Sequence, residues 1–523
     1  FNDWGHNRRV NVNVRGGSEK VSYYASVSYF NETGMTVTDK SINTFDSKMK
    51  YSRYNFTTNL SIDVTPTTKV EIGAQGYLGE GNYPAISSKD LYNAAMSISP
   101  VEYPKMFFVN GEAYIPGRST NNNFNNPYSQ ATRRGYDNLT KNQIYSNLRI
   151  TQDLDMLTKG LKLTAMYAFD VYNEIHVHQD RAESTYYFLD TNVPYDLDGQ
   201  PILQRIYTGT NVLSYKQETS GNKKTYLEAS LNYDRAFGDH RVSGLFLFNQ
   251  QQKLLYPKGT LEDAIPYRMM GIAGRATYSW NDRYFAEFNL GINGSENFSP
   301  GKRYGVFPAF GLGWAVSNES FWNPVRKYIS FLKFRYTDGW VGSDTATGRR
   351  FMYQGVFTGL TGTMFGTNYT SANGYGEEKY GVNVTWSKSR KQDLGIDIKF
   401  LNDNLSFVVD FFKERRDNIF LQRSTIPSYA GWIENPYANL GVVENKGIEL
   451  AMDYTQRLGK KTFLTVRGNL TFNKDKIIEN DEPPVDYPWM ETRGTNVNAT
   501  WGFIADGLFT SQTEIEDHAT QFG

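Results

Sequence analysis

The chain repeatedly alternates apolar and polar residues, and short turns join the alternating stretches in pairs. Val10, Val12 and Val14 alternate with polar residues, and the pattern returns at 21–30 after a Gly16-Gly17 turn. Because successive side chains of a strand point to opposite faces, each stretch has one apolar and one polar face. The pattern predicts a series of antiparallel hairpins.

About sixteen strands satisfy this test of alternation. They lie near residues 10–16, 21–30, 53–64, 69–79, 142–153, 160–173, 224–235, 240–251, 271–281, 283–294, 304–316, 330–337, 391–400, 404–415, 446–457 and 461–473. One of them contains Pro308, although proline is normally kept out of central strands. We expect a bulge there, and the alternative is that the small residues Gly305, Gly311 and Gly313 leave room for a plug inside the barrel.

The connections between strands are alternately short and long. The short turns lie around Gly16-Gly17, Pro66, Lys159, Gly238, Asn281-Asp282, Asn323-Pro324, Asn402-Asp403 and Gly459. The long loops are 31–52, 80–141, 174–223, 252–270, 295–303, 338–390, 416–445 and a stretch from 474. This asymmetry is typical of an outer-membrane β-barrel, with short periplasmic turns and long extracellular loops. Within one loop, residues 88–98 predict a short helix capped by Ser88.

The composition agrees with a barrel and excludes several other classes. Only 39% of the 523 residues are hydrophobic. We find no run of about 18 apolar residues, which excludes a transmembrane helix. Aromatic residues reach 15%, and their rings suit the two interfacial girdles of a barrel. The 55 basic residues balance 55 acidic ones, so the chain has no net positive charge that would favour binding to nucleic acid. With no cysteine, disulfides, thiol catalysis and cysteine-based metal sites are excluded.

The sequence offers little catalytic or metal chemistry. His176 and His178 are two residues apart and would share one face of a strand, as a metal pair requires. No third ligand is visible near them, so we interpret them as part of a solvated loop and assign no metal and no cofactor. No nucleophile elbow or phosphate-binding loop is present, and we expect no enzyme activity.

Aromatic residues in or near the long loops are the candidates for contact with a substrate or a partner protein. They are Trp340, Tyr375, Trp386, Trp432, Tyr437, Trp489 and Trp501. Clusters at 121–126 and 371–376 mix amides with rings, which suits both sugars and peptides. The alternative interpretation, without a binding role, is that each cluster is a flexible outer loop.

Several motifs together resemble those of SusC/RagA-type TonB-dependent transporters. The similar segments are Gly17–Lys20 with Tyr23–Ala25, Arg283–Phe285, Asn293–Ser295, Arg303–Pro308, Gly313-Trp314, Asn318–Phe321, Asp393–Asp397, Asn439–Gly441, Asn445–Leu450, Trp501–Phe503 and Asp506–Phe509. They occur in the order of the family and extend over nearly the whole chain. One departure is Gly291–Ser295, where the family commonly has an Arg-x-Asp-Gly-Ser run.

The resemblance implies a barrel of about 22 strands around a plugged lumen. No plug, TonB box or closing strands are visible, so we expect residues 1–523 to be the central, partial barrel of a longer protein. The family implies energy-dependent import of oligosaccharides or peptides in the outer membrane of a Gram-negative, Bacteroidetes-type bacterium. It also implies three partners: TonB acting on the plug, a SusD-like surface lipoprotein as a lid, and a second transporter–lid pair.

Two other functions remain open at this point. One is a passive porin or an outer-membrane assembly or secretion pore, without a plug or TonB coupling. The other is a barrel enzyme acting on lipid, which would need a nucleophile and a base facing the bilayer. The sequence does not identify the substrate, the residues that contact it or the oligomeric state.

Overall fold

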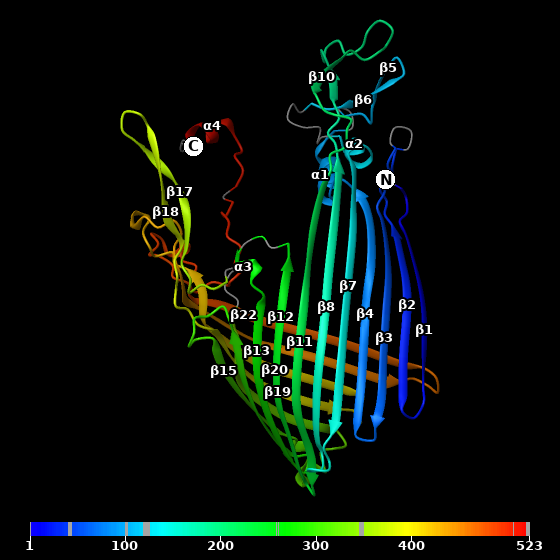
Figure 1. Cartoon of the computed structure of the whole chain (residues 1–523), viewed down its shortest axis with the longest axis vertical. Helices are drawn as coiled ribbons and strands as arrows, with labels where there is room; N and C mark the ends of the chain where they lie inside the picture. The colour runs from blue at the N-terminus through cyan, green and yellow to red at the C-terminus, as the bar shows by residue number, and fades with distance from the viewer. Residues whose placement is uncertain are drawn as a thin grey trace. The chain divides into compact units, whose positions relative to one another are not determined.

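The chain forms two compact units, Phe1–Pro308 and Ala309–Gly523. In this computed structural model, the residues described are 2–39, 44–99, 103–118, 126–257, 259, 261–344, 350–505 and 507–518. Each unit is built on long antiparallel strands that pair in the order of the sequence (Figure 1).

The long strands of the first unit pair as consecutive hairpins. They are β1 (His6–Gly17), β2 (Val21–Thr33), β3 (Lys50–Thr65), β4 (Thr68–Pro84), β7 (Gly135–Asp153), β8 (Leu161–Asp180), β11 (Lys216–Phe237), β12 (His240–Tyr256), β13 (Tyr267–Trp280) and β14 (Tyr284–Ser295). The next strand, β15 (Tyr304–Trp314), begins in this unit and ends in the second. Its pairing with the strand that follows begins at Ala309, so Pro308 lies just outside that ladder.

The second unit continues the same pattern. Its long strands are β16 (Ile329–Ser343), β19 (Ser387–Phe400), β20 (Leu405–Gln422), β21 (Tyr437–Arg457) and β22 (Phe463–Glu479). All sixteen strands predicted from the alternation are therefore confirmed within the described part of the chain. Most of them extend further toward the long loops than the sequence pattern indicated. For example, β8 continues to Asp180, which corrects the interpretation of His176 and His178 as loop residues.

One face of the first unit is apolar from strand to strand. Register places Leu60 beside Ile72, then Leu148, Tyr167 and Leu227 on successive strands. The last four of these side chains are between 39% and 48% exposed to the surroundings. Exposed apolar side chains in continuous rows form the lipid-facing band of a barrel.

The second unit repeats the division into two faces. Ile396, Val409, Leu450 and Leu470 form one apolar row. On the opposite face, Arg335 binds Asp397 at 3.0 Å and Asp410 at 2.9 Å. A charged network of this kind belongs on the water-facing side, because a charge at mid-depth in lipid is costly.

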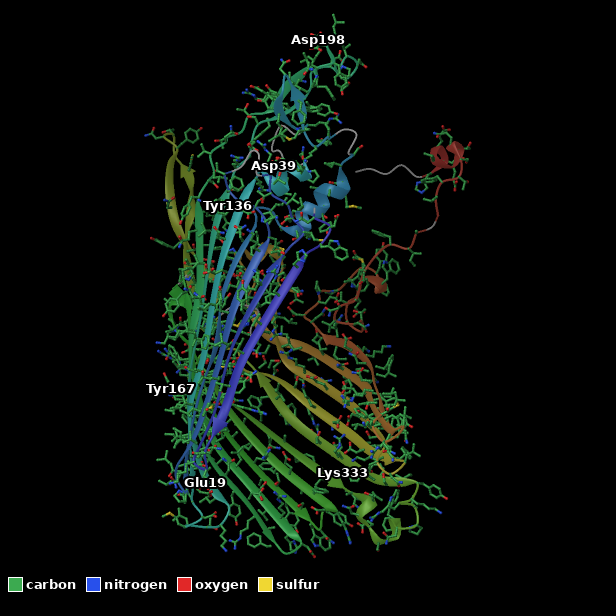
Figure 2. All side chains as sticks on the ribbon, turned by 90° about the vertical axis from the view of Figure 1, so that its right-hand side faces the viewer. Glu19, Asp39, Tyr136, Tyr167, Asp198 and Lys333 are labelled. Carbon is green, nitrogen blue, oxygen red and sulfur yellow. The ribbon has the colours of Figure 1, made fainter. Side chains whose placement is uncertain are left out.

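The short turns lie where the sequence placed them. Asn281 and Asp282 both have φ of 51°, and Asn402 has φ of 54°. Asn and Asp tolerate the left-handed region, so these residues close tight hairpins. In the first unit, Figure 2 shows Glu19 at the end of the strands that carries the short turns, Tyr167 along the strands, and Asp198 at the far tip of a long loop.

The long loops contain short elements of their own. These are α1 (Ser88–Ser97), β5 (Phe107–Val109), β6 (Glu112–Pro116), α2 (Pro127–Thr132), β9 (Thr185–Phe188), β10 (Leu203–Tyr207), α3 (Leu261–Ala264), β17 (Val356–Phe365), β18 (Thr370–Lys379), η3 (Ser428–Ala430), η4 (Pro488–Met490) and α4 (Gln512–Asp517). Two further 3-10 turns, η1 (Val316–Asn318) and η2 (Ser320–Trp322), lie in the connection from β15 to β16.

The helix predicted at 88–98 is confirmed as α1, but its cap is one residue earlier. The hydroxyl of Ser87 accepts a hydrogen bond from the backbone N–H of Asp90 at 3.1 Å. Ser87 has extended backbone angles, as an N-cap residue requires, whereas Ser88 is already helical.

No helix in the described ranges has the length and apolar character needed to cross a membrane.

Candidate functional site

The loops of the first unit fold against each other at the end opposite the short turns. β5, β6, β9 and β10 form a small sheet in the order β10-β9-β6-β5. Its central pair is parallel, with Ile115 beside Thr185, and joins two loops that are far apart in sequence. Buried apolar side chains gather here, including Leu91, Phe107 and Ile115. These loops therefore have a core of their own, although the sequence pattern predicted only the helix among these elements.

A buried ion pair fastens the same two loops together. The guanidinium of Arg133, at the end of α2, donates two hydrogen bonds of 2.7 Å to the carboxylate of Glu183, just before β9. The two side chains are only 9% and 7% exposed. Such a bidentate contact fixes both distance and orientation.

Aromatic rings cover the small loop sheet. Phe107 lies edge-on to Phe188 with ring centroids 5.0 Å apart, and Tyr114 lies edge-on to Tyr186 at 4.8 Å. Phe108, on the opposite side of β5, is 60% exposed. Exposed rings next to tyrosine hydroxyls suit the apolar faces and polar edges of sugars or peptides.

A cavity of about 890 Å³ lies near the loop end of the first unit. It is lined by Thr36, Met49, Tyr83–Ser88, Leu91, Arg134, Asp137, His178, Asp180, Ser214–Lys216 and Glu218. Its charged groups are close to one another: Lys216 lies 2.5 Å from Glu218, and Arg134 lies 3.8 Å from Asp180. A volume of this size and polarity can accept a small polar ligand or part of a larger one.

The two histidines highlighted by the sequence lie on the polar face of β8, and His178 lines this cavity. The structure adds Asp137 of β7, which lies directly opposite His178 in the strand pairing. Oδ1 of Asp137 is 3.2 Å from Nδ1 of His178 and 3.6 Å from Nδ1 of His176. Sequence spacing gave no sign of Asp137, but the register of the β7–β8 hairpin would have identified it.

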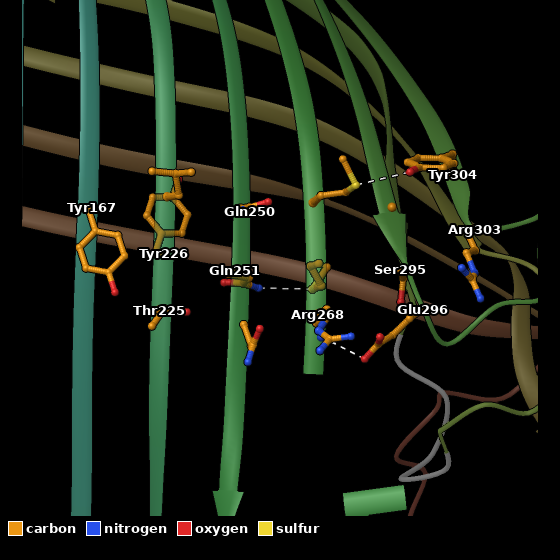
Figure 3. Close-up of a pocket in the computed structure, with 15 residues that line it drawn as sticks. Tyr167, Thr225, Tyr226, Gln250, Gln251, Arg268, Ser295, Glu296, Arg303 and Tyr304 are labelled. Carbon is orange, nitrogen blue, oxygen red and sulfur yellow. Dashed lines mark hydrogen bonds between the residues drawn. The ribbon is translucent and has the colours of Figure 1, made fainter. Parts of the chain in front are cut away.

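A second hollow, of about 460 Å³, lies along the strands from β8 to β15 (Figure 3). Tyr167, Leu227, Gln250 and Met270 form one row across its wall, in which the amide of Gln250 interrupts the apolar side chains. Gly294 ends the row, where a Cβ atom would lie 2.7 Å from the ring of Tyr304. Gln252, Arg268, Glu296 and Arg303 also line the hollow, so its wall mixes apolar and charged side chains.

The aromatic candidates named from the sequence all lie in the second unit, and three of them lie against another ring or a guanidinium. Trp432 packs against Tyr380 with centroids 4.9 Å apart. Trp340 lies on β16, and the guanidinium of Arg390 is 6.0 Å from its ring. Trp489 stacks on Tyr487 at 4.7 Å.

The same candidates differ widely in exposure. Tyr375, on β18, is 86% exposed, Trp489 is 70% exposed and Trp501 is 55% exposed. Trp386 is only 2% exposed, directly before β19, and Tyr437 is half-buried at the start of β21. Contact with a large ligand is therefore open to the first three rings and closed to Trp386 in this conformation. Of the amide cluster at 121–126, residues 121–125 lie outside the described residues.

Several loop groups have shifted pKa values. Burial alone would raise the pKa of Asp46, but hydrogen bonds from Lys50, Thr38 and the backbone of Lys48 lower it to about 2. Burial likewise opposes ionisation of Glu482, but the backbone N–H groups of Thr492 and Arg493 hold the pKa of this carboxyl below its usual value. Hydrogen bonds to the charged form thus outweigh desolvation in both loops.

Comparison with known proteins gives a consistent result. The family model described as TonB dependent receptor-like, beta-barrel matches residues 107–513. TonB-dependent receptor P39 of Formosa agariphila is 24% identical over 508 residues, covering 91% of this chain and 43% of the relative. TonB-dependent receptor SusC of Bacteroides thetaiotaomicron is 28% identical over 209 residues, covering 39% of this chain and 20% of the relative.

Solved structures extend the likeness to the fold. The RagAB peptide importer in its closed-closed state has a TM-score of 0.66 at 16% identity, covering 93% of this chain and 53% of that chain. The outer membrane transporter YddB of Escherichia coli has a TM-score of 0.54 at 8% identity, covering 91% of this chain and 56% of that chain. The chain spans about half the length of the curated relatives that match most of it.

Proposed function

Because this chain belongs to the TonB-dependent receptor β-barrel family, we propose that it is the barrel part of an outer-membrane importer for oligosaccharides or peptides. The family match over residues 107–513 carries this proposal. The family is one of receptors and transporters rather than of enzymes. The passive-pore alternative lacks comparable support, since all the curated relatives reported above are TonB-dependent receptors.

The polar interior and the loops have separate roles in this proposal. The cavity at the loop end of the first unit receives the substrate on its way into the barrel. The aromatic rings on the small loop sheet, such as Phe108, supply the outer receptor surface. The substrate class stays open between oligosaccharides and peptides, because rings and amides bind both.

Two partners follow from the proposed mechanism. A SusD-like lipoprotein closes the outer mouth, and TonB supplies energy through a plug in the complete protein. Names of the relatives support this assignment: SusC among the curated proteins and the RagAB peptide importer among the solved structures. We further propose that the exposed rings of Tyr375, Trp489 and Trp501 contact the substrate or the lid, and that Trp340, Trp432 and Tyr437 contribute to the same binding surface. Trp386, being buried, would act by supporting its neighbours.

The test is native mass spectrometry of the full-length protein extracted gently from its own outer membrane. We expect a polypeptide heavier than the 59.7 kDa of this chain, together with a co-purifying lipoprotein. Replacing Tyr375 by alanine should lower recovery of the lipoprotein. The matched control is Tyr328→Ala, because Tyr328 is 66% exposed in the connection between β15 and β16. A lone barrel that conducts ions through an open channel in a planar bilayer would overturn the proposal and favour the passive pore.

A further inference from the structure

Three side chains that could bind a metal ion meet on the polar face of the first unit. Asp137, His176 and His178 each offer one ligand atom, and these atoms all lie within 4.8 Å of one another. Among the residues that the structure describes, this is the one group of three such side chains this close. All three are carried by the paired strands β7 and β8 rather than by loops.

Two of the three distances between ligand atoms match the geometry of a tetrahedral site, and the third is at most 4.8 Å. A zinc ion bound at about 2.0–2.1 Å keeps its ligand atoms roughly 3.3 Å apart. Oδ1 of Asp137 lies 3.2 Å from Nδ1 of His178 and 3.6 Å from Nδ1 of His176. The two imidazole rings are nearly parallel, with centroids 5.5 Å apart, so both edges face the same carboxylate.

Two of these atoms are enclosed and lack hydrogen bonds. Oδ1 of Asp137 and Nδ1 of His176 are inaccessible to solvent, and neither has a hydrogen-bond partner within the described ranges. Buried polar atoms are normally satisfied, and a missing ion is one physical reason for an exception. Two of the three atoms that would bind the metal are thus left unsatisfied.

The carboxylate of Glu174 lies against Nε2 of His176, on the side of the ring away from Asp137. Oε1 of Glu174 lies 2.8 Å from Nε2 of His176, and the Lys141 ammonium lies 3.1 Å from the same oxygen. The hydroxyl of Tyr172 donates to the other carboxylate oxygen. An ionised carboxylate only accepts hydrogen bonds, so a His176 ring that binds a metal through Nδ1 would donate its Nε2–H to Glu174. Metal-binding histidines commonly have such a carboxylate behind them, which orients the ring and raises its basicity.

The surrounding charge also favours a cation. Glu218 lies 3.8 Å from Nε2 of His178 and is paired with Lys216. Counting Asp137, Glu174 and Glu218 against Lys141 and Lys216 gives three negative and two positive charges, a formal balance of −1. A divalent ion would bring this cluster to +1.

We propose that Asp137, His176 and His178 bind a divalent transition metal ion, with zinc as the expected one. Two imidazole nitrogens and a carboxylate oxygen are ligands that zinc prefers. Because Asp137 and His178 line the cavity, the fourth coordination position opens into it and takes water or an anionic oxygen of a ligand. This inference goes beyond the proposed function and does not depend on it, since metal binding and transport are measured separately.

The experiment uses the full-length protein that contains this chain, purified in detergent and stripped with a chelator. Co²⁺ is the spectroscopic probe, followed by Zn²⁺ alone in a calorimetric titration. We expect a single equivalent of Co²⁺ to give the strong visible absorption of a four-coordinate site, and Zn²⁺ to displace it. His176→Ala and His178→Ala should abolish this signal, while Glu174→Gln should weaken affinity about 10–100-fold.

Two further variants keep the result interpretable. Asp137→Asn preserves side-chain size, and heat-modifiable migration on a gel shows whether the barrel is still folded. His240→Ala is the matched control, since His240 lies at the short-turn end of β12, where its Nδ1 bonds to the hydroxyl of Tyr278 at 2.7 Å. Affinity that is unchanged in folded Asp137→Asn, or that survives loss of both His176 and His178, would overturn the proposal. So would the absence of stoichiometric binding to the wild-type protein.

Discussion

The ion pair between Arg133 and Glu183 provides a sharp test of how the outer loops are held. Arg133→Ala removes the two hydrogen bonds of 2.7 Å and leaves the Glu183 carboxylate buried. Breaking a buried pair in this way typically costs about 3–5 kcal/mol. Nη2 of Arg181 lies 3.3 Å from Oε1 of Glu183 and compensates in part. We therefore expect the low end of the range, about 3 kcal/mol.

The consequence is local opening rather than loss of the barrel. Since about 1.4 kcal/mol is a factor of ten, the opening equilibrium of these loops should rise by roughly 100-fold. Hydrogen–deuterium exchange with mass spectrometry measures this directly on peptides that cover α2 and β9. The strand β8 is hydrogen-bonded to β7 on one side and to β11 on the other, so its amides should stay protected from exchange.

Two controls separate charge burial from other effects. The double variant Arg133→Met with Glu183→Leu should recover part of the protection, because it removes the unpaired Glu183 carboxylate while Arg181 keeps its hydrogen bonds to the backbone carbonyls of Arg133 at 3.1 Å and Asn211 at 2.9 Å. Arg241→Ala removes a pair of the same bidentate form with Asp234, but those side chains are 64% and 57% exposed, so we expect no measurable change. Unchanged exchange in Arg133→Ala, or a double variant no better than the single one, would refute this reasoning.

Two smaller predictions concern the other loops. Ser87→Ala should destabilise α1 by about 1 kcal/mol while Ser88→Ala has little effect, as measured by exchange of the helix amides, and equal effects would contradict the assignment of the cap. Because hydrogen bonds lower the pKa of Asp46 from 3.8 to about 2, its stabilisation of the loop should be complete above pH 3.8 and disappear as the pH falls through about 2. A spin label on a cysteine replacing Lys48 would report this as increased mobility, and a transition centred near neutral pH would contradict it.

The strands were predictable because alternation is a local signal. Leu227, Ala229 and Leu231 share a face in any strand, so no knowledge of the rest of the fold is needed. The strand ends were underestimated toward the loops. There the polar and apolar faces differ less in character, and pairing with the neighbouring strand extends the ladder, as for β8 up to Asp180.

The loop sheet and the third metal ligand depend on contacts between distant segments. Ile115 pairs with Thr185, and neither short segment has an alternating pattern that predicts a strand. Asp137 is likewise far from His176 in sequence, although the two lie on adjacent strands. The exposure of Tyr375 and the burial of Trp386 also follow from tertiary packing, so all the loop aromatics looked equivalent in the sequence.

The long strands of the first unit have a thermodynamic consequence for anything that binds at their loop ends. A transmembrane strand needs about 9–11 residues, whereas β7 has 19, β8 has 20 and β11 has 22. The surplus places residues such as Asp137 and Glu218 on hydrogen-bonded sheet, whereas a flexible loop must lose about 1–2 kcal/mol of backbone entropy for each residue that it orders around a ligand. A ligand that reaches this region meets side chains whose backbone is already ordered, so little of its binding energy is spent on organising the protein.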